Sequence, residues 1–315
     1  MKRLISIVVS LAILGIIYWR IDRGGLVDAF GASDLWWLAV ALLALAPITV
    51  VTAWRFTRLV PDSAHIGLGE AIRLTLAASS LNLVLPSKMG DLAKAWFIRE
   101  RGHMPGSLAV ALVVYEKTCD MLALLVWCIV GLLFFADKGL LFWTLTAGVA
   151  GGLVLGLLLL GSRGFAAAFF QIAARVAPAR IAAALDGLAA DWSAMHAYFW
   201  ADRGRVLLIA VVSLAIWFLH LVQIWLLILA LNATVPFLDN LALAPLAILA
   251  GLLPLTFAGI GTRDAALILF FAPYMAAPVG AALGLLCTLR YVLPALAGLP
   301  FLGAYLGILR GEGRG

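Results

Sequence analysis

The chain has 315 residues, of which 65% are hydrophobic and only 12% are charged. Soluble domains carry about 25% charged residues, so this composition excludes an ordinary soluble enzyme, a disordered protein and a secreted disulfide-bonded domain. Together with the mean hydropathy of +1.10, it indicates one integral membrane domain over residues 1–315.

Several apolar stretches have the length of a membrane-spanning helix, which needs about 20 apolar residues. The alternating pattern of a membrane β-barrel does not occur. We therefore predict an all-α polytopic protein with about six full spans. The first span is expected to stay uncleaved, because Tyr18-Trp19-Arg20 lacks the small residues of a signal-peptide cleavage site. The predicted spans are residues 4–19, 35–53, 107–135, 140–161, 206–231 and 278–309.

The basic residues indicate how the chain is oriented. Lys2 and Arg3 precede the first span, Arg310 follows the last one, and most other Lys and Arg residues, including Arg55 and Lys94, fall on the same side. Because cytoplasmic loops carry an excess of basic residues, both termini are expected to be cytoplasmic. The net charge of +6 then suits a surface that faces anionic lipid headgroups. Nucleic acid is not expected as a partner, since no soluble basic module is present.

Residues 70–101 form the first broken apolar segment. The limbs 71–85 and 92–98 flank the turn Leu85-Pro86-Ser87-Lys88-Met89-Gly90-Asp91. Pro86 disfavours a helical conformation at the preceding residue, and Gly90 permits a tight turn. Each limb is too short to cross a membrane, so the pattern predicts a re-entrant hairpin.

The span at 107–135 contains the charged run Glu116, Lys117 and Asp120. Residues four apart share one face of a helix, and an ionisable residue inside a membrane span is a functional candidate. The alternative is a span that begins at Met121 and leaves these charges at the interface.

Residues 163–205 are too polar to be a span. An apolar stripe from Ile181 to Phe199 predicts an amphipathic helix on the cytoplasmic membrane surface, or one packed against the cytoplasmic ends of the spans. The cysteines and histidines have no metal-ligand spacing, so neither a metal nor a cofactor is expected.

Residues 241–273 form the second broken segment. Its turn contains Gly259, Gly261, Arg263 and Asp264, and its second limb ends before Pro273. The order of features repeats that of the first segment, and two such segments entering from opposite faces are typical of an inverted-repeat transporter. The alternative is that two broken helices occur by chance in a chain that is rich in glycine and proline.

Three motifs in order carry a resemblance: Leu85-Pro86-Ser87-x-x-Gly90-Asp91, Glu116-Lys117-x-x-Asp120 and Gly259-x-Gly261-x-Arg263-Asp264. They resemble the lysylphosphatidylglycerol synthase transmembrane family, over about residues 4–309. The family more often has Glu-Arg at Glu116-Lys117, and often has Arg-Glu at Arg263-Asp264.

The resemblance implies a flippase-like protein of the cell inner membrane that moves lipids between leaflets. The separate soluble aminoacyltransferase domain of the synthases is not expected in this chain. Stand-alone relatives are associated with hopanoid, glycolipid and isoprenoid-linked pathways. The resemblance therefore does not determine which lipid is moved. A homodimer and lipid-synthesis enzymes are the partners to consider.

We expect a lipid headgroup to enter a polar cavity between the two broken segments. Lys88, Arg263 and Arg290 are the candidates for holding a phosphate, and Glu116 and Asp120 would contact polar headgroup atoms or exchange protons. No G-x-x-x-x-G-K-[ST] motif is present, so movement should be passive or ion-coupled. The candidate binding residues are Arg73, Asn82, Pro86, Ser87, Lys88, Asp91, Glu116, Lys117, Asp120, Gly259, Gly261, Arg263, Asp264 and Arg290.

Three other functions remain open. One is an intramembrane enzyme that acts on a lipid phosphate, with Glu116 and Asp120 as acid and base. The others are a secondary transporter for a small solute and a structural subunit of a lipid-synthesis complex. We expect the protein not to be an enzyme, because no nucleophile–histidine pair or metal set occurs in the sequence.

Overall fold

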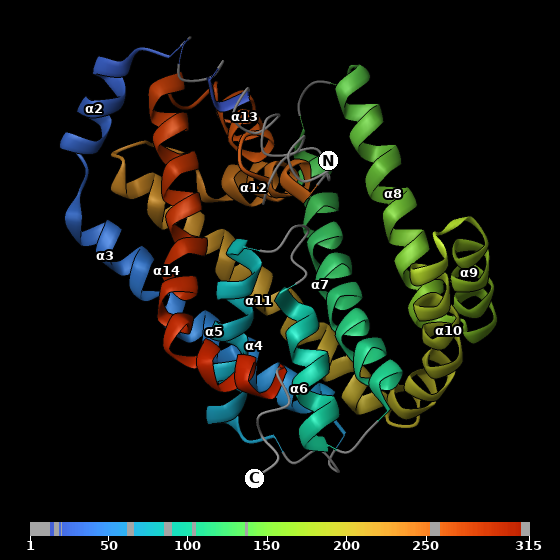
Figure 1. Cartoon of the computed structure of the whole chain (residues 1–315). Helices are drawn as coiled ribbons and strands as arrows, with labels where there is room; N and C mark the ends of the chain where they lie inside the picture. The colour runs from blue at the N-terminus through green and yellow to red at the C-terminus, as the bar shows by residue number, and fades with distance from the viewer. Residues whose placement is uncertain are drawn as a thin grey trace.

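The computed structural model describes residues 13–15, 19, 21–61, 66–84, 90–102, 105–135, 138–252 and 259–309. Over these ranges the regular structure is entirely helical (Figure 1), and the predicted all-α polytopic fold is confirmed. Five helical stretches are long and apolar enough to span a membrane. They match all the predicted spans except 4–19, most of which lies outside the described residues. The five stretches are Leu35–Leu59, Gly106–Phe134, Leu140–Gly161, Arg203–Ala230 and Ala277–Gly303.

Aspartate side chains begin several of these helices. Asp22 accepts hydrogen bonds from the first backbone N–H groups of α2, and Asp34 does the same for α3. Asp202 caps α11 in the same way. Such caps satisfy N–H groups that have no partner inside the helix, and they place each carboxylate at the start of the helix rather than within its apolar run. The helices concerned are α2 (Arg23–Gly31), α3 (Leu35–Leu43) and α11 (Arg203–Ala230).

Two long helices organise the centre of the molecule. α14 (Ala277–Leu309) packs along α5 (Leu68–Val84), and α7 (Gly106–Phe134) packs along α12 (Phe237–Leu252). Each long helix therefore contacts the first short helix of the other half of the chain. In Figure 1 both long helices run through most of the height of the molecule.

A glycine lies at the closest point of each of these two crossings. A Cβ atom on Gly131 of α7 would collide with the carbonyl oxygen of Ala242 on α12, and one on Gly298 of α14 would collide with that of Leu76 on α5. The absence of a side chain is what allows the two backbones to approach so closely.

The two broken segments appear as pairs of short helices. α5 and α6 (Leu92–Gly102) have 17 and 11 residues, and α12 and α13 (Thr262–Phe270) have 16 and 9. All four are shorter than the length of about 20 residues that spans a bilayer. Residues 85–89 and 253–258, which join the members of each pair, lie outside the described residues. The helices of each pair flank these residues, and re-entry into the membrane stays a prediction.

The amphipathic segment forms two helices, α9 (Arg163–Val176) and α10 (Ala179–Trp200), which pack on each other at the end of α8 (Leu140–Gly161) (Figure 1). The apolar stripe of α10 faces the protein: Trp192 and Phe199 are buried. Phe199 stacks on Tyr115 of α7 with ring centroids 4.1 Å apart. α10 thus packs against the long helix α7, and its position at the cytoplasmic membrane surface stays a prediction.

Candidate functional site

A cavity of about 250 Å³ lies between α4 (Leu45–Leu59), α5, α6, α7, α11 and α14. One part of its wall is apolar, with Leu45, Ile216 and Trp217. Another part carries neutral hydrogen-bonding groups from Thr52, Ser79 and Asn82. Charged side chains complete the lining: Arg55, Asp91, Lys94, Lys117, Asp120 and Arg290. A cavity of this composition, between helices long enough to span a membrane, is a candidate binding site.

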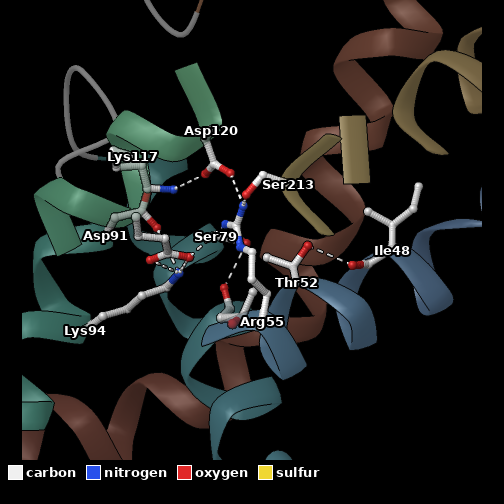
Figure 2. A network of polar contacts seen from close by, with 11 residues as sticks. Ile48, Thr52, Arg55, Ser79, Asp91, Lys94, Lys117, Asp120 and Ser213 are labelled. Carbon is white, nitrogen blue, oxygen red and sulfur yellow. Dashed lines mark hydrogen bonds and ion pairs between the residues drawn. The ribbon is translucent and has the colours of Figure 1, made fainter. Parts of the chain in front are cut away.

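Six charged side chains beside this cavity form a closed ring in which positive and negative groups alternate. We call it the charge ring. Figure 2 shows Arg55 and Lys117 approaching Asp120 from different helices. The closest N–O distances are 3.2 Å for Arg55–Glu116, 3.3 Å for Glu116–Lys94, 3.6 Å for Lys94–Asp91, 2.9 Å for Asp91–Lys117 and 3.5 Å for Lys117–Asp120, and an Asp120–Arg55 contact closes the ring.

Helix geometry accounts for most of this arrangement. Glu116, Lys117 and Asp120 project from neighbouring positions of α7, where residues three and four apart lie on one face. Asp91 and Lys94 are also three apart, at the start of α6. Arg55 ties α4 to α7, because one of its nitrogens bonds Glu116 and the other bonds Asp120. The second nitrogen also donates to Ser213 Oγ of α11 at 2.8 Å.

The ring contains three cations and three anions and is therefore neutral. Its innermost members are buried: the side chains of Arg55, Lys94 and Glu116 are 1%, 2% and 0% exposed to solvent. Lys117 is the most open, with 42% of its side chain accessible. Removing a charge from water is costly unless it is paired, so the alternation of signs is what permits six charges at this depth.

Arg290 lies outside the ring, on α14. It is 3% exposed, donates to the backbone oxygen of His220 at 3.3 Å and to the hydroxyl of Tyr291 at 3.2 Å, and its Nε is buried without a hydrogen-bond partner. No carboxylate of the described residues forms an ion pair with Arg290. The lining of the cavity therefore has one guanidinium group whose charge is not matched by an acidic side chain in the described part of the chain.

Arg263 was expected to face the same cavity, but it does not. It donates to Asp264 Oδ1, to the Gly284 carbonyl at 3.0 Å and to Thr288 Oγ1 at 2.7 Å. Asp264 in turn accepts from the backbone N–H of Gly261. These contacts fix the start of α13 against α14, and Arg263 is not part of the cavity lining.

The remaining predicted residues divide between the cavity and other places. Asn82 lines the cavity, whereas Arg73 is exposed on α5 and does not. Gly259 and Gly261 have φ angles of 75° and 102°, a region open to glycine and strained for other residues, so they shape the turn that precedes α13. Glu116 belongs to the charge ring but does not line the cavity. Pro86, Ser87 and Lys88 lie outside the described residues.

Among the charge ring and the groups hydrogen-bonded to it, the sequence did not predict Arg55, Lys94 and Ser213. Arg55 and Lys94 were counted among the cytoplasmic charges, but both are buried in the ring. A signal was present for Arg55 and for Lys94. Thr52 and Arg55 are three apart and form a polar face on α4, and Lys94 follows Asp91 by three residues. Ser213 gave no signal, because a single serine is common in an apolar helix.

The described residues contain no group of three or more His, Cys, Asp or Glu side chains that could hold a metal ion. Cys119, Cys128 and Cys287 are all buried and unpaired. The site within the described ranges is thus built from ion pairs and hydrogen-bonding groups.

Fold and site together define a polytopic helical membrane protein with a charged cavity enclosed by its spanning helices. Residues 3–298 match the family described as the lysylphosphatidylglycerol synthase TM region, and the chain belongs to this family. This membership ties the protein to lipid handling in a membrane. A comparison with curated proteins found no similar sequence.

Proposed function

We propose that the protein is a flippase-like transporter that moves a phospholipid or another envelope lipid between the leaflets of the cell inner membrane, with both termini in the cytoplasm. One observation carries the proposal: a cavity lined by six charged side chains lies between membrane-spanning helices. Such a cavity offers a polar environment to a headgroup while the hydrocarbon chains stay in the bilayer. Membership of the family also supports the proposal of lipid transport.

The unmatched charge of Arg290 supports an anionic headgroup. The charge ring is neutral, so Arg290 adds one positive charge to the lining, and its Nε is still available as a donor. A guanidinium binds a phosphate through charge-assisted hydrogen bonds. Polar headgroup atoms would meet Lys117 and Asp120, which are the ring members most open to the cavity.

The packing of the two halves supports an inverted repeat with alternating access. α7 packs along α12 just as α14 packs along α5, and each pair brings a long helix onto a broken segment of the opposite half. Figure 1 places α6 and α13 near opposite ends of the molecule. In transporters built this way, one repeat moves against the other. The cavity is lined by residues of the first broken segment and by none from α12 or α13, so it does not lie between the two broken segments as the sequence suggested.

The ion pairs favour transport over acid–base catalysis. Glu116 is held by Arg55 and Lys94 and does not line the cavity, and Asp120 is held by Arg55 and Lys117. A general acid or base must reach the proton it transfers. We therefore propose that the protein is not an enzyme and that its partner in the membrane is an unmodified lipid.

Reconstitution into liposomes tests the proposal. Purified protein in phosphatidylcholine vesicles should accelerate the exchange of a labelled phosphatidylglycerol between leaflets, without changing the mass of the lipid. Arg290→Gln should slow this exchange about tenfold or more, because it removes hydrogen bonds to a charged group. Arg73→Gln is the matched control, since Arg73 is an exposed arginine outside the cavity. Equal rates with and without protein, or a lipid product of altered mass, would refute the proposal.

A further inference from the structure

A second hollow adjoins the charged cavity, between α7 and α8. It is an open groove of about 580 Å³. Its lining is almost wholly apolar: Val113, Val114, Met121 and Leu125 of α7, Leu155 and Leu159 of α8, and Leu249 of α12. Three glycines, Gly148, Gly152 and Gly156, form one side of it. Because they are four residues apart, they share one face of α8.

The glycine face already packs within the protein at one end and is open at the other. A Cβ atom on Gly156 would lie 2.7 Å from Leu122, and one on Gly152 would lie 3.1 Å from Leu125. A Cβ atom on Gly148 would meet nothing within 4 Å. The helices thus touch near Gly156 and diverge toward Gly148, which leaves room for a slender molecule rather than for another helix.

The groove and the charged cavity share two lining residues, Asp91 and Lys117. These residues form the 2.9 Å ion pair of the charge ring. One face of this pair meets the polar cavity and another meets the apolar groove. A single amphipathic molecule can therefore contact both spaces at once, with its polar end on the side of the ion pair that faces the cavity.

We infer that the groove between α7 and α8 binds one acyl chain of the glycerophospholipid whose headgroup occupies the charged cavity. This inference rests on the proposed function and deepens it. The lining matches a hydrocarbon chain, and the outer surface of α8 is itself apolar, with Trp143 63% and Val154 57% exposed. The groove is therefore reached from the lipid phase. The Asp91–Lys117 pair marks the boundary between headgroup and chain.

Gly148→Leu tests the inference with little risk to folding, because the added side chain enters open space. Gly151→Leu is its matched control: Gly151 is exposed on the same helix, also has nothing within 4 Å of its Cβ position, and does not line the groove. The probe is phosphatidylglycerol with a diazirine in one acyl chain, at trace level in phosphatidylcholine vesicles. Irradiation is followed by mass spectrometry of the labelled peptides.

We expect the wild-type protein to be labelled in the peptides that contain Met121 and Leu155. Gly148→Leu should reduce this labelling about tenfold, the loss expected if roughly two methylene groups are expelled from the groove. Gly151→Leu should leave it unchanged. The absence of label at these peptides, or an equal effect of the two variants, would overturn the inference.

The labelling does not depend on transport, so the two proposals fail separately. If the wild type exchanges lipid between leaflets but Gly148→Leu is labelled normally, the acyl-chain site is wrong and the transport proposal stands. If the Gly148→Leu and Gly151→Leu labelling differs as expected but no leaflet exchange occurs, the acyl-chain site stands and the transport proposal is wrong.

Discussion

The Arg55 guanidinium lies 3.2 Å from the Glu116 carboxylate, between helices α4 and α7, and both side chains are almost fully shielded. Each residue also has a second partner of opposite charge within the charge ring. Loss of one member leaves a partner charge buried without compensation, which typically costs about 3–5 kcal/mol.

Glu116→Gln should therefore lower the stability of the purified protein by about that amount. Lys94→Met should have a similar effect, because it leaves an excess negative charge instead. The double variant removes one charge of each sign, so the ring stays neutral and much of the stability should return. Thermal unfolding in detergent measures all three, with the exposed Asp186→Asn as a control within about 0.5 kcal/mol of wild type. Additive losses in the double variant would contradict the role of charge balance.

Arg263 and Arg290 provide a second contrast, between a structural and a ligand-facing arginine. Arg263 bonds Asp264, Gly284 and Thr288 and does not line the cavity. Arg263→Gln should lower stability by about 3–5 kcal/mol, because Asp264 loses its cationic partner. Arg290→Gln should instead lower lipid exchange with a smaller loss of stability.

The measurement is thermal unfolding and leaflet exchange on the same preparations of both variants, with exchange rates expressed per folded molecule. A specific loss of exchange in Arg263→Gln that equals the loss in Arg290→Gln would show that both arginines contact the lipid. That result would restore the role that the sequence alone suggested for Arg263.

Much of the helical fold could be predicted from the sequence, because hydropathy reports directly which segments are long and apolar enough to cross a bilayer. The ends of α5 and α12 near residues 84 and 252 agree with the short apolar limbs seen in the sequence. Four of the six ring members, Asp91, Glu116, Lys117 and Asp120, could be predicted from their motifs. Arg55 and Lys94 could not, because each pairs with Glu116 from another helix. A basic residue near the end of a span can mark the cytoplasmic side of the membrane, or it can pair with a buried carboxylate. The hydropathy of the segment does not distinguish these two cases.

Burial of His196 on α10 sets a dependence of stability on pH. Arg163 Nε donates a hydrogen bond to His196 Nδ1 at 3.0 Å. Burial, and then the charge of Arg163, lower the pKa of His196 below its ordinary value of 6.5. The folded protein thus prefers the neutral imidazole, whereas the unfolded chain binds a proton near pH 6.5. The contribution of this residue to stability is complete above that pH and declines as the pH falls through the lowered pKa.

His196→Gln should reduce this decline, because glutamine does not titrate and its side-chain oxygen can accept from Arg163. The midpoint of thermal unfolding is measured in detergent at a series of pH values between 5 and 8. The wild type should lose stability toward the acidic end more steeply than the variant. Parallel curves for the two proteins would show that the acid sensitivity arises elsewhere.

Gly298 of α14 touches the backbone of α5, since a Cβ atom there would overlap the Leu76 carbonyl oxygen and the Ser80 hydroxyl. Gly303, five residues further along α14, has open space at the same position. In an exposed helix, glycine to alanine stabilises by roughly 0.5–1 kcal/mol because alanine favours the helical backbone, and Gly303→Ala should show this gain. Gly298→Ala should instead destabilise by about 1–3 kcal/mol, as expected for overpacking, because a backbone carbonyl cannot rotate away as a side chain can.

Unfolding midpoints of the two variants should therefore move in opposite directions from the wild type. A shift of Gly298→Ala in the same direction as Gly303→Ala would mean that α14 and α5 are not in close contact at this crossing, and the packing of each long helix on the opposite half would lose its support.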